Sequence, residues 1–321
     1  MSEVVTRSLI AAGISLVISI LIGPIAISNL RKLKAGQVIR DDGPKSHMKK
    51  SGTPSMGGVI IIVSLLLGSA AATPGYSMLP WALFITTGCG LVGMLDDYIS
   101  IVSHRSLGLR ARQKILFQLI FGLILGAWAY SNPNIGSEII IPFSDGRMID
   151  LGIWYIPFTM LVLVASANAV NLSDGLDGLA SGTMAIASFA YVAVASSVGH
   201  GEAGAFAGAV GGACLGFIWW NAYPAAIFMG DTGSLALGAA LASMAVLTRT
   251  ELLLLVIGGV YVAEAMSDVI QVAYFKLTGK RVFRMAPIHH HFELKGVPEP
   301  KIVVRFWIVA AFLAALGFAA L

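Results

Sequence analysis

The sequence predicts an all-α polytopic membrane protein, and its composition and its long apolar stretches carry that prediction. Of the 321 residues, 57% are hydrophobic and only 12% are charged, and the mean hydropathy is +0.82. Soluble domains carry about 25% charged residues. A water-soluble chain of this size could not bury so much apolar surface, so an integral membrane protein is expected.

Ten apolar stretches have lengths near the roughly 20 residues that a helix needs to cross a bilayer. They are continuous rather than alternating, which favours helices over barrel strands. The first stretch is too long for the core of a signal peptide and is interpreted as a retained span. Without a convincing repeat or linker, residues 1–321 are expected to form a single membrane domain. Nine or eleven spans also fit, but the preferred ten cover residues 4–27, 56–73, 78–95, 114–131, 154–170, 179–198, 203–220, 233–248, 251–273 and 302–321.

Lysine and arginine residues predict the orientation, because cytoplasmic loops are enriched in them. With ten spans, 18 of the 21 fall in one class of loops, and the other class holds only Arg7, Arg147 and Arg249. The first class is therefore expected to be cytoplasmic, with both termini outside. Cys89 and Cys214 lie within spans and indicate neither a disulfide nor a metal site. The net charge of +4 follows from this bias and gives no reason to expect nucleic acid as a partner.

Acidic residues gather at the predicted cytoplasmic ends of the spans. Asp96 and Asp97 end the third span, where carboxylates oppose the helix dipole and are costly at a membrane edge unless they have partners. Asp231 lies between glycines ahead of the eighth span, where an ordinary helix N-cap is the rival interpretation. Proteins hold Mg²⁺ with one or two carboxylates and the oxygens of a substrate phosphate. The pattern predicts a metal-dependent site for an anionic substrate on the cytoplasmic face.

Two further polar segments lie on the same predicted side. The run from Asn171 to Gly178 contains Asp174 and Asp177, which share one face if the sixth helix begins there. His289, His290 and His291 follow one another in a predicted loop. Adjacent side chains do not readily converge on one tetrahedral metal, so a structural zinc site is not expected. Hydrogen bonding to phosphate or nucleotide and a plain polar turn both stay open for the histidines.

An ordered series of motifs along nearly the whole chain resembles the phospho-N-acetylmuramoyl-pentapeptide-transferase family, within the polyprenyl-phosphate N-acetylhexosamine-1-phosphate transferase superfamily. The triple-histidine segment points to this branch rather than to enzymes that transfer N-acetylglucosamine phosphate. The motifs are Lys50 to Gly58, Leu95 to Tyr98, Asn168 to Ala180, Asn221 with Phe228 to Ser234, Gln271 to Gly279, and Ala286 to Gly296.

The resemblance implies a homodimer of ten-helix subunits in the bacterial cytoplasmic membrane. It implies transfer of phospho-MurNAc-pentapeptide from UDP-MurNAc-pentapeptide to undecaprenyl phosphate, giving lipid I and UMP in peptidoglycan synthesis, with Mg²⁺ required. By position, Asp231 would bind Mg²⁺, and Asp96 and Asp97 would act near the lipid phosphate, one of them as a candidate base. The residues implied to bind the substrates are Lys50, Ser55, Lys114, Asn171, Leu172, Asp174, Asp177, Asn221, Phe228, Gly230, Gln271, His289, His290 and His291.

The chain departs from the family pattern at a few positions. Ser100 stands where the family has a lysine, so Lys114 is the cation expected to neutralise phosphate. Ser55 and Ser173 replace threonines and keep the hydroxyl. Because a phosphate monoester is largely ionised near neutral pH, positioning and charge neutralisation are expected to matter more than a general base.

Two other classes of protein are weighed against this one. A cation-coupled transporter would place its acids near the middle of the bilayer, where only Glu264 and Asp268 of the ninth span fit. A non-catalytic scaffold does not explain the clustered aspartates. The paired glycines Gly258 and Gly259 weaken the ninth helix. This helix is expected to bend away from the bundle and to form a wall of a lipid-facing opening beside Asp96 and Asp97, near the cytoplasmic edge.

Overall fold

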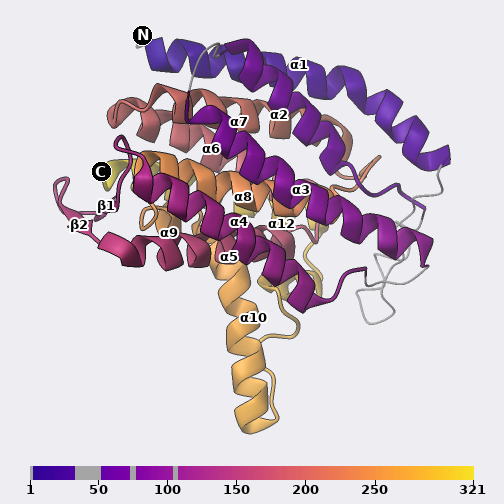
Figure 1. The fold of residues 1–321 in the computed structure, drawn as a ribbon. Helices are drawn as coiled ribbons and strands as arrows, with labels where there is room; N and C mark the ends of the chain where they lie inside the picture. The colour runs from indigo at the N-terminus through magenta and orange to yellow at the C-terminus, as the bar shows by residue number, and fades with distance from the viewer. Residues whose placement is uncertain (1–2, 33–51, 73–76, 104–107) are drawn as a thin grey trace.

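The structure, a computed structural model, describes residues 3–32, 52–72, 77–103 and 108–321, and most of these residues are helical (Figure 1). A short antiparallel hairpin, with strand β1 (Glu138–Ile140) paired to β2 (Met148–Asp150), and the 3₁₀ turn η2 (Gly152–Trp154) precede α5. The helices are α1 (Glu3–Lys32), α2 (Gly58–Ala72), α3 (Leu79–Val102), α4 (Ala111–Ser131), α5 (Tyr155–Ser173), α6 (Leu179–Ser197), α7 (Gly201–Asn221), α8 (Gly230–Thr248), α9 (Leu254–Ile257), α10 (Gly259–Thr278), α11 (Ile288–Glu293) and α12 (Glu299–Ala319).

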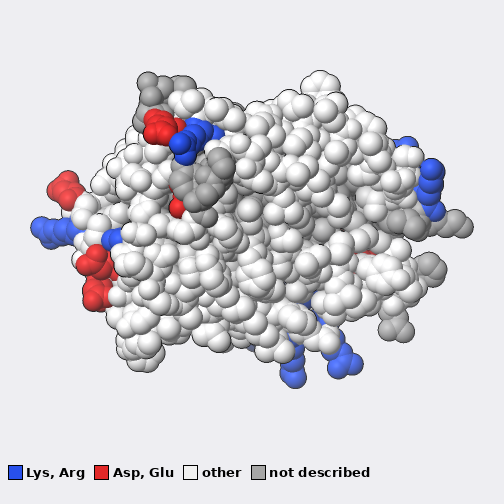
Figure 2. Space-filling view, turned by 45° about the horizontal axis from the view of Figure 1, so that its top comes forward, with Lys and Arg blue, Asp and Glu red and all other residues white. Residues whose placement is uncertain are grey.

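Among the described residues, eight helices are long and apolar enough to cross a membrane: α1, α3, α4, α5 with η2, α6, α7, α8 and α12. They coincide with eight of the ten predicted spans. The second predicted span becomes α2, with only 15 residues, and the ninth becomes α9 and α10. Figure 2 shows a broad surface without charged side chains between charged groups toward the edges of the molecule, as a lipid-facing surface requires. The all-α polytopic class is confirmed, and the count of ten stays a prediction.

The centre of the bundle is α8, whose residues from Thr232 to Thr248 are all buried. Its neighbours include α2, α3 and α5. A helix that is apolar on every side belongs in such a position. Helices α1 and α7 approach one another closely, because a Cβ at Gly208 or Gly212 of α7 would lie 2.2 or 2.0 Å from a backbone oxygen of α1. Small residues at a contact are the usual means by which membrane helices pack tightly.

The ninth predicted span is broken at Gly258, which ends α9 and precedes α10. In Figure 1, α10 leaves the bundle and projects away from it, whereas the long helices lie side by side. The predicted bend at the paired glycines is therefore confirmed. The physical cause is the weak helix propensity of glycine where α9 ends.

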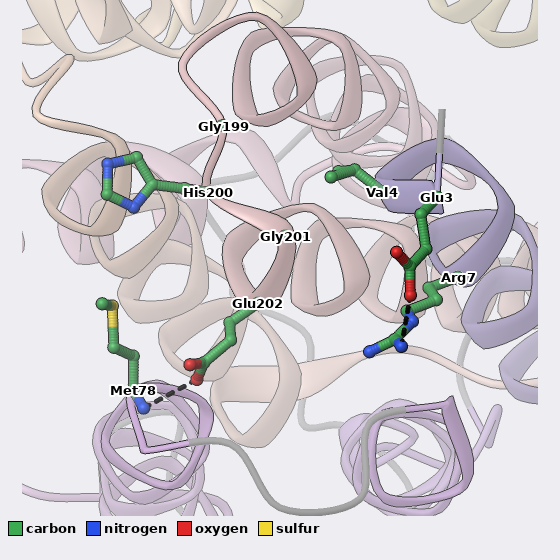
Figure 3. Close-up of a pocket in the computed structure, with 8 residues that line it drawn as sticks. All are labelled: Glu3, Val4, Arg7, Met78, Gly199, His200, Gly201 and Glu202. Atoms are coloured by element: carbon green, nitrogen blue, oxygen red, sulfur yellow. Dashed lines mark hydrogen bonds and ion pairs between the residues drawn. The ribbon is translucent and has the colours of Figure 1, made fainter. Parts of the chain in front are cut away.

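Both chain ends lie at the end of the bundle that carries the hairpin (Figure 1). Beside the start of α1, Glu202 of α7 accepts hydrogen bonds from the backbone N–H groups of Met78 and Leu79 at 2.7 and 2.8 Å, and thereby caps α3. Figure 3 shows this carboxylate at a cavity of about 280 Å³ that the Glu3–Arg7 ion pair also lines. At 1.5 Å per residue, Asp96 lies roughly 25 Å away along α3, so this cavity is remote from the aspartates.

Candidate active site

Three aspartates from two helices meet at the opposite end of the bundle. Asp96 and Asp97 lie in the last two turns of α3, and Asp231 lies in the first turn of α8. One carboxylate oxygen from each lies within 4.8 Å of the other two. The close approach depends on Gly93, because a Cβ there would lie 2.0 Å from the backbone oxygen of Asp231. The structure thus brings together the three residues that the sequence singled out as catalytic.

Asp97 serves as the cap of α8. Its Oδ1 accepts from the backbone N–H of Asp231 at 3.1 Å, and its Oδ2 accepts from the N–H and the hydroxyl of Thr232 at 2.9 and 2.6 Å. The N-cap residue itself is Met229, which provides no side-chain hydrogen bond. The rival interpretation of Asp231 as an N-cap is therefore wrong. The N-terminal dipole of α8 also favours the negative charge on Asp97. Helix α3 continues past the aspartates to Val102 and does not end at residue 95 as the predicted span did.

Lys114, in the first turn of α4, neutralises part of this cluster. Its ammonium lies 3.1 Å from Oδ1 of Asp96 and donates a hydrogen bond to Oδ2 of Asp231. The same oxygen of Asp96 accepts from the backbone N–H of Leu109 at 2.6 Å. Hydrogen bonds to charged groups are about twice as strong as neutral ones. The cation predicted for phosphate neutralisation therefore lies directly between two of the three carboxylates.

Asn171 fixes the remaining oxygen of Asp231. From the last turn of α5, its Nδ2 donates to Oδ1 of Asp231 and to the hydroxyl of Ser234, both at 2.8 Å. Leu172 is half-buried in the same turn. Ser55 belongs to the same cluster, because a Cβ at Gly230 would lie 2.5 Å from Oδ2 of Asp97 and 2.8 Å from the Ser55 hydroxyl.

The expectation that Asp174 and Asp177 share one face of the sixth helix is wrong. Helix α6 begins only at Leu179, and Asp174 is the C-cap residue that follows α5. Asp177 lies between the two helices, where Oδ2 accepts from the N–H of Ala225 at 3.0 Å. Its own N–H donates to Oε1 of Glu299 at 2.8 Å. Asp177 therefore ties its loop to the segment after α7 and to the start of α12.

Two more predicted residues hold backbone segments together. Oδ1 of the buried Asn221 accepts from the N–H of Gly178 at 3.1 Å, and its Nδ2 donates to the oxygen of Ile227 at 2.9 Å. The N–H of Phe228 donates to the oxygen of Pro54 at 2.8 Å. The Phe228–Pro54 bond holds the segment before α8 against the segment before α2. Lys50, also predicted to bind substrate, lies outside the described residues.

The three histidines lie on a short helix, α11, and not in a loop as expected. His289 is fully buried, with Nδ1 3.0 Å from Oε2 of Glu264. Nδ1 of His290 lies 2.7 Å from Oε2 of Glu293. Nδ1 of His291 accepts from the backbone N–H of Arg284 at 3.1 Å, which leaves its Nε2 as the donor when the ring is neutral. The three rings therefore have three different partners.

Gln271 of α10 joins this second group of residues. Its Oε1 accepts from the N–H groups of Val282 and Phe283 at 3.0 and 2.9 Å, and its Nε2 donates to the oxygen of Phe283 at 3.0 Å. The side chain thus holds the segment that leads into α11. The first group surrounds the aspartates, and the second spans α10 and α11.

Sequence reasoning missed several residues that complete the site. Thr232 hydrogen-bonds to Asp97, and Ser234 hydrogen-bonds to Asn171. Both follow Asp231 in the Gly-Asp-Thr-Gly-Ser run, where the aspartate and the glycines carry the sequence prediction. Glu293 and Glu299 pair with His290 and with the backbone of Asp177. The i,i+3 spacing of His290 and Glu293 is a local pattern that could have marked Glu293. No local pattern marks Glu299, since its partner lies 122 residues earlier in the chain.

The aspartate cluster suits a hard divalent cation. All three donors are carboxylate oxygens, the ligand type that Mg²⁺ prefers, and they converge within 4.8 Å of one another. Ligands on opposite sides of an octahedral Mg²⁺ lie about 4 Å apart, given metal–oxygen distances of about 2.0–2.1 Å. Among the described residues, this is the one group of three or more histidine, cysteine and acidic side chains able to hold a metal.

Comparisons with known proteins identify the family of the chain. The glycosyl transferase family 4 model matches residues 79–249, and a phospho-N-acetylmuramoyl-pentapeptide-transferase signature matches residues 50–62. A curated relative of that name from Geobacillus thermodenitrificans is 50% identical over 312 residues, which covers 96% of each chain. Another from Clostridioides difficile is 49% identical over 311 residues, covering 97% of this chain and 96% of the relative. A third, from Citrifermentans bemidjiense, is 46% identical over 331 residues, covering 98% and 92%. The chain therefore belongs to the phospho-N-acetylmuramoyl-pentapeptide-transferase family of enzymes, within glycosyl transferase family 4.

Proposed function

We propose that the protein transfers phospho-MurNAc-pentapeptide from UDP-MurNAc-pentapeptide to undecaprenyl phosphate, forming lipid I and releasing UMP. The observation that carries the proposal is the convergence of Asp96, Asp97 and Asp231 around Lys114 at one end of the bundle. Two anionic substrates must meet in this reaction, so their repulsion has to be offset by cations. A cluster that combines a fixed ammonium with a carboxylate set suited to Mg²⁺ meets that need.

In this proposal Asp231 is the principal Mg²⁺ ligand, and Asp96 and Asp97 lie beside it. Bound Mg²⁺ would supply charge neutralisation at the phosphates. Asn171 and Asp97 orient Asp231, the first through its side-chain amide and the second through the start of α8. Lys114 holds positive charge beside Asp96 and Asp231, where it would meet a substrate phosphate.

Asp96 is the better candidate for a base, because both oxygens of Asp97 already accept hydrogen bonds from α8. Its part stays secondary to positioning, since the lipid phosphate is largely ionised near neutral pH. The donor's nucleotide-sugar would contact residues predicted for it in the last turn of α5 and the loop that follows, Asn171 to Asp177. On α11 it would contact His290 and His291, since His289 is fully buried.

The carrier lipid would approach along α10, which leaves the bundle (Figure 1). A cavity of about 400 Å³ opens between α10, α11 and α12, and its walls are mainly apolar, including Val260, Phe306 and Val309. An apolar groove beside a helix that departs from the bundle fits a prenyl chain that must stay in lipid. The opening beside Asp96 and Asp97 themselves stays a prediction.

The proposal places the chain in the bacterial cytoplasmic membrane as a single ten-span domain, acting as a homodimer. The aspartate end would face the cytoplasm and both termini the outside. The positive-inside count supports this orientation, as does the location of both chain ends opposite the aspartates (Figure 1).

The test is Mg²⁺-dependent release of UMP from UDP-MurNAc-pentapeptide by the purified protein, with and without undecaprenyl phosphate. We expect release only when both Mg²⁺ and the lipid are present. Asp231→Asn keeps the size of the side chain and should lower turnover at least about a hundredfold, a loss of roughly 3 kcal/mol. Near-normal turnover of Asp231→Asn at ordinary Mg²⁺ would contradict the assignment.

A further inference from the structure

Glu264 and His289 form a fully buried pair that the proposed reaction does not use directly. Neither side chain has exposed surface, and the two are joined by the 3.0 Å contact between Oε2 and Nδ1. Ionisable side chains are almost never fully buried unless they are paired, because desolvation of an isolated charge costs several kcal/mol. Whichever atom carries the proton, the hydrogen bond is the reason that both residues are tolerated at these positions.

His289 connects three segments that are distant in the sequence. Glu264 lies on α10 beyond the break at Gly258, and His289 lies on α11. The imidazole also fills the space beside Gly175, in the loop between α5 and α6, where a Cβ would lie 2.2 Å from Nε2. The Glu264–His289 pair therefore joins the departing helix, the histidine helix and the acidic loop.

Helix α11 depends on such contacts for its position. It has six residues, and isolated helices shorter than about 12 residues are marginal in water. The ring of His289 contacts that of His290 at a tilt of 56°, with centroids 4.1 Å apart. Any displacement of His289 therefore moves the face of α11 that carries His290 and His291.

We propose that Glu264 is a positioning residue: by binding His289 it holds α11 against the acidic loop, and so places His290 and His291 for the donor nucleotide-sugar. The inference rests on the proposed function, in which these two histidines contact that substrate. The hydrogen bonds of Asp96, Asp97 and Asp231 go to other residues. The pair should therefore act on binding of the donor and not on the chemical step.

The functional test compares Glu264→Ala, Glu264→Gln and the control Met266→Ala, whose side chain is exposed on the same helix. Loss of a buried hydrogen bond worth about 1.4 kcal/mol should raise the KM for UDP-MurNAc-pentapeptide about tenfold in Glu264→Ala. The kcat and the KM for undecaprenyl phosphate should stay within about twofold of wild type. Glu264→Gln keeps the shape and an acceptor oxygen, so it should restore most of the donor affinity.

A second test measures the pair without any substrate. Thermal unfolding of purified Glu264→Ala, His289→Ala and the double variant should be non-additive, because either single change already breaks the bond. Gly175→Ala should lower the midpoint in the wild type and lower it less in His289→Ala, which leaves space for the added methyl group. These unfolding measurements do not depend on the identity of the reaction.

The outcomes separate the two proposals. If the wild type releases no UMP, the proposed function fails, and the thermal cycle still decides whether the pair is coupled. If the wild type is active, an unchanged KM for UDP-MurNAc-pentapeptide in Glu264→Ala refutes positioning. Equal increases in the KM for both substrates that Glu264→Gln does not reverse also refute it. Additive unfolding midpoints would refute the coupling itself.

Discussion

Replacing Lys114 by methionine should lower activity and strengthen binding of Mg²⁺ at the same time. The ammonium contacts Oδ1 of Asp96 at 3.1 Å and is hydrogen-bonded to Oδ2 of Asp231. Those oxygens belong to the carboxylates that converge as the candidate metal ligands. Methionine keeps the unbranched shape and most of the length of the side chain and removes the charge. The carboxylates therefore lose a competitor for the metal, and the substrate phosphate loses a cation.

The size of the effect follows from the geometry. At 3.1 Å, two unit charges attract by about 5 kcal/mol with an effective dielectric constant near 20. Desolvation and ordering of the side chains reduce the net value of such a contact to about 1.5–3 kcal/mol. If a substrate phosphate makes a contact of the same quality in the transition state, kcat/KM should fall about a hundredfold.

The assay is UMP release across a series of Mg²⁺ concentrations. For Lys114→Met we expect the hundredfold loss together with an apparent Mg²⁺ affinity at least about tenfold higher. Arg112→Met is the matched control, since it removes an exposed cation from the same turn of α4 and should change neither value by more than about twofold. Weaker Mg²⁺ binding in Lys114→Met, or unchanged activity, would refute the reasoning.

Three further predictions concern packing, topology and pH. Gly93→Ala should lower both the thermal midpoint and turnover, because its Cβ would lie 2.0 Å from a backbone oxygen of α8. In the control Gly13→Ala the added Cβ meets nothing within 4 Å, so neither quantity should fall. Equal effects of the two variants would contradict the packing argument. Cysteines at positions 290 and 136, replacing His290 and Gly136, should be labelled in sealed vesicles from the inside and from the outside respectively, and the reverse pattern would overturn the topology. Burial, with Lys295 and Arg284 nearby, lowers the pKa of His291 in the folded protein. Because the unfolded chain takes up the proton at higher pH, the free energy of unfolding should fall as the pH drops through the unfolded pKa of about 6.5. His291→Gln should remove that part of the pH dependence of unfolding.

The membrane class and the three aspartates could be predicted from the sequence because each leaves a local pattern. Long apolar stretches predict helices, and the sidedness of the loops predicts that Asp96, Asp97 and Asp231 lie at one end of the bundle. Paired glycines similarly predicted the break before α10.

Other features depend on contacts between distant segments and leave no such pattern. Asp97 caps a helix that begins more than 130 residues later, and the partner of His289 is a glutamate 25 residues earlier on another helix. The start of α6 after Asp177 is set by bonds to Ala225 and Glu299. Spacing of three residues suggested a shared helical face there, and the tertiary contacts determined otherwise.

The central claim is that the carboxylates of Asp96, Asp97 and Asp231 form one divalent-cation site. Mn²⁺ binding to the purified protein, followed by electron paramagnetic resonance and by competition with Mg²⁺, tests it directly. We expect one site in the wild type, binding at least about tenfold weaker in Asp231→Asn, a loss of about 1.4 kcal/mol, and unchanged binding in Asp145→Asn, which alters an aspartate of the exposed hairpin. Equal affinity in Asp231→Asn and the wild type would contradict the account.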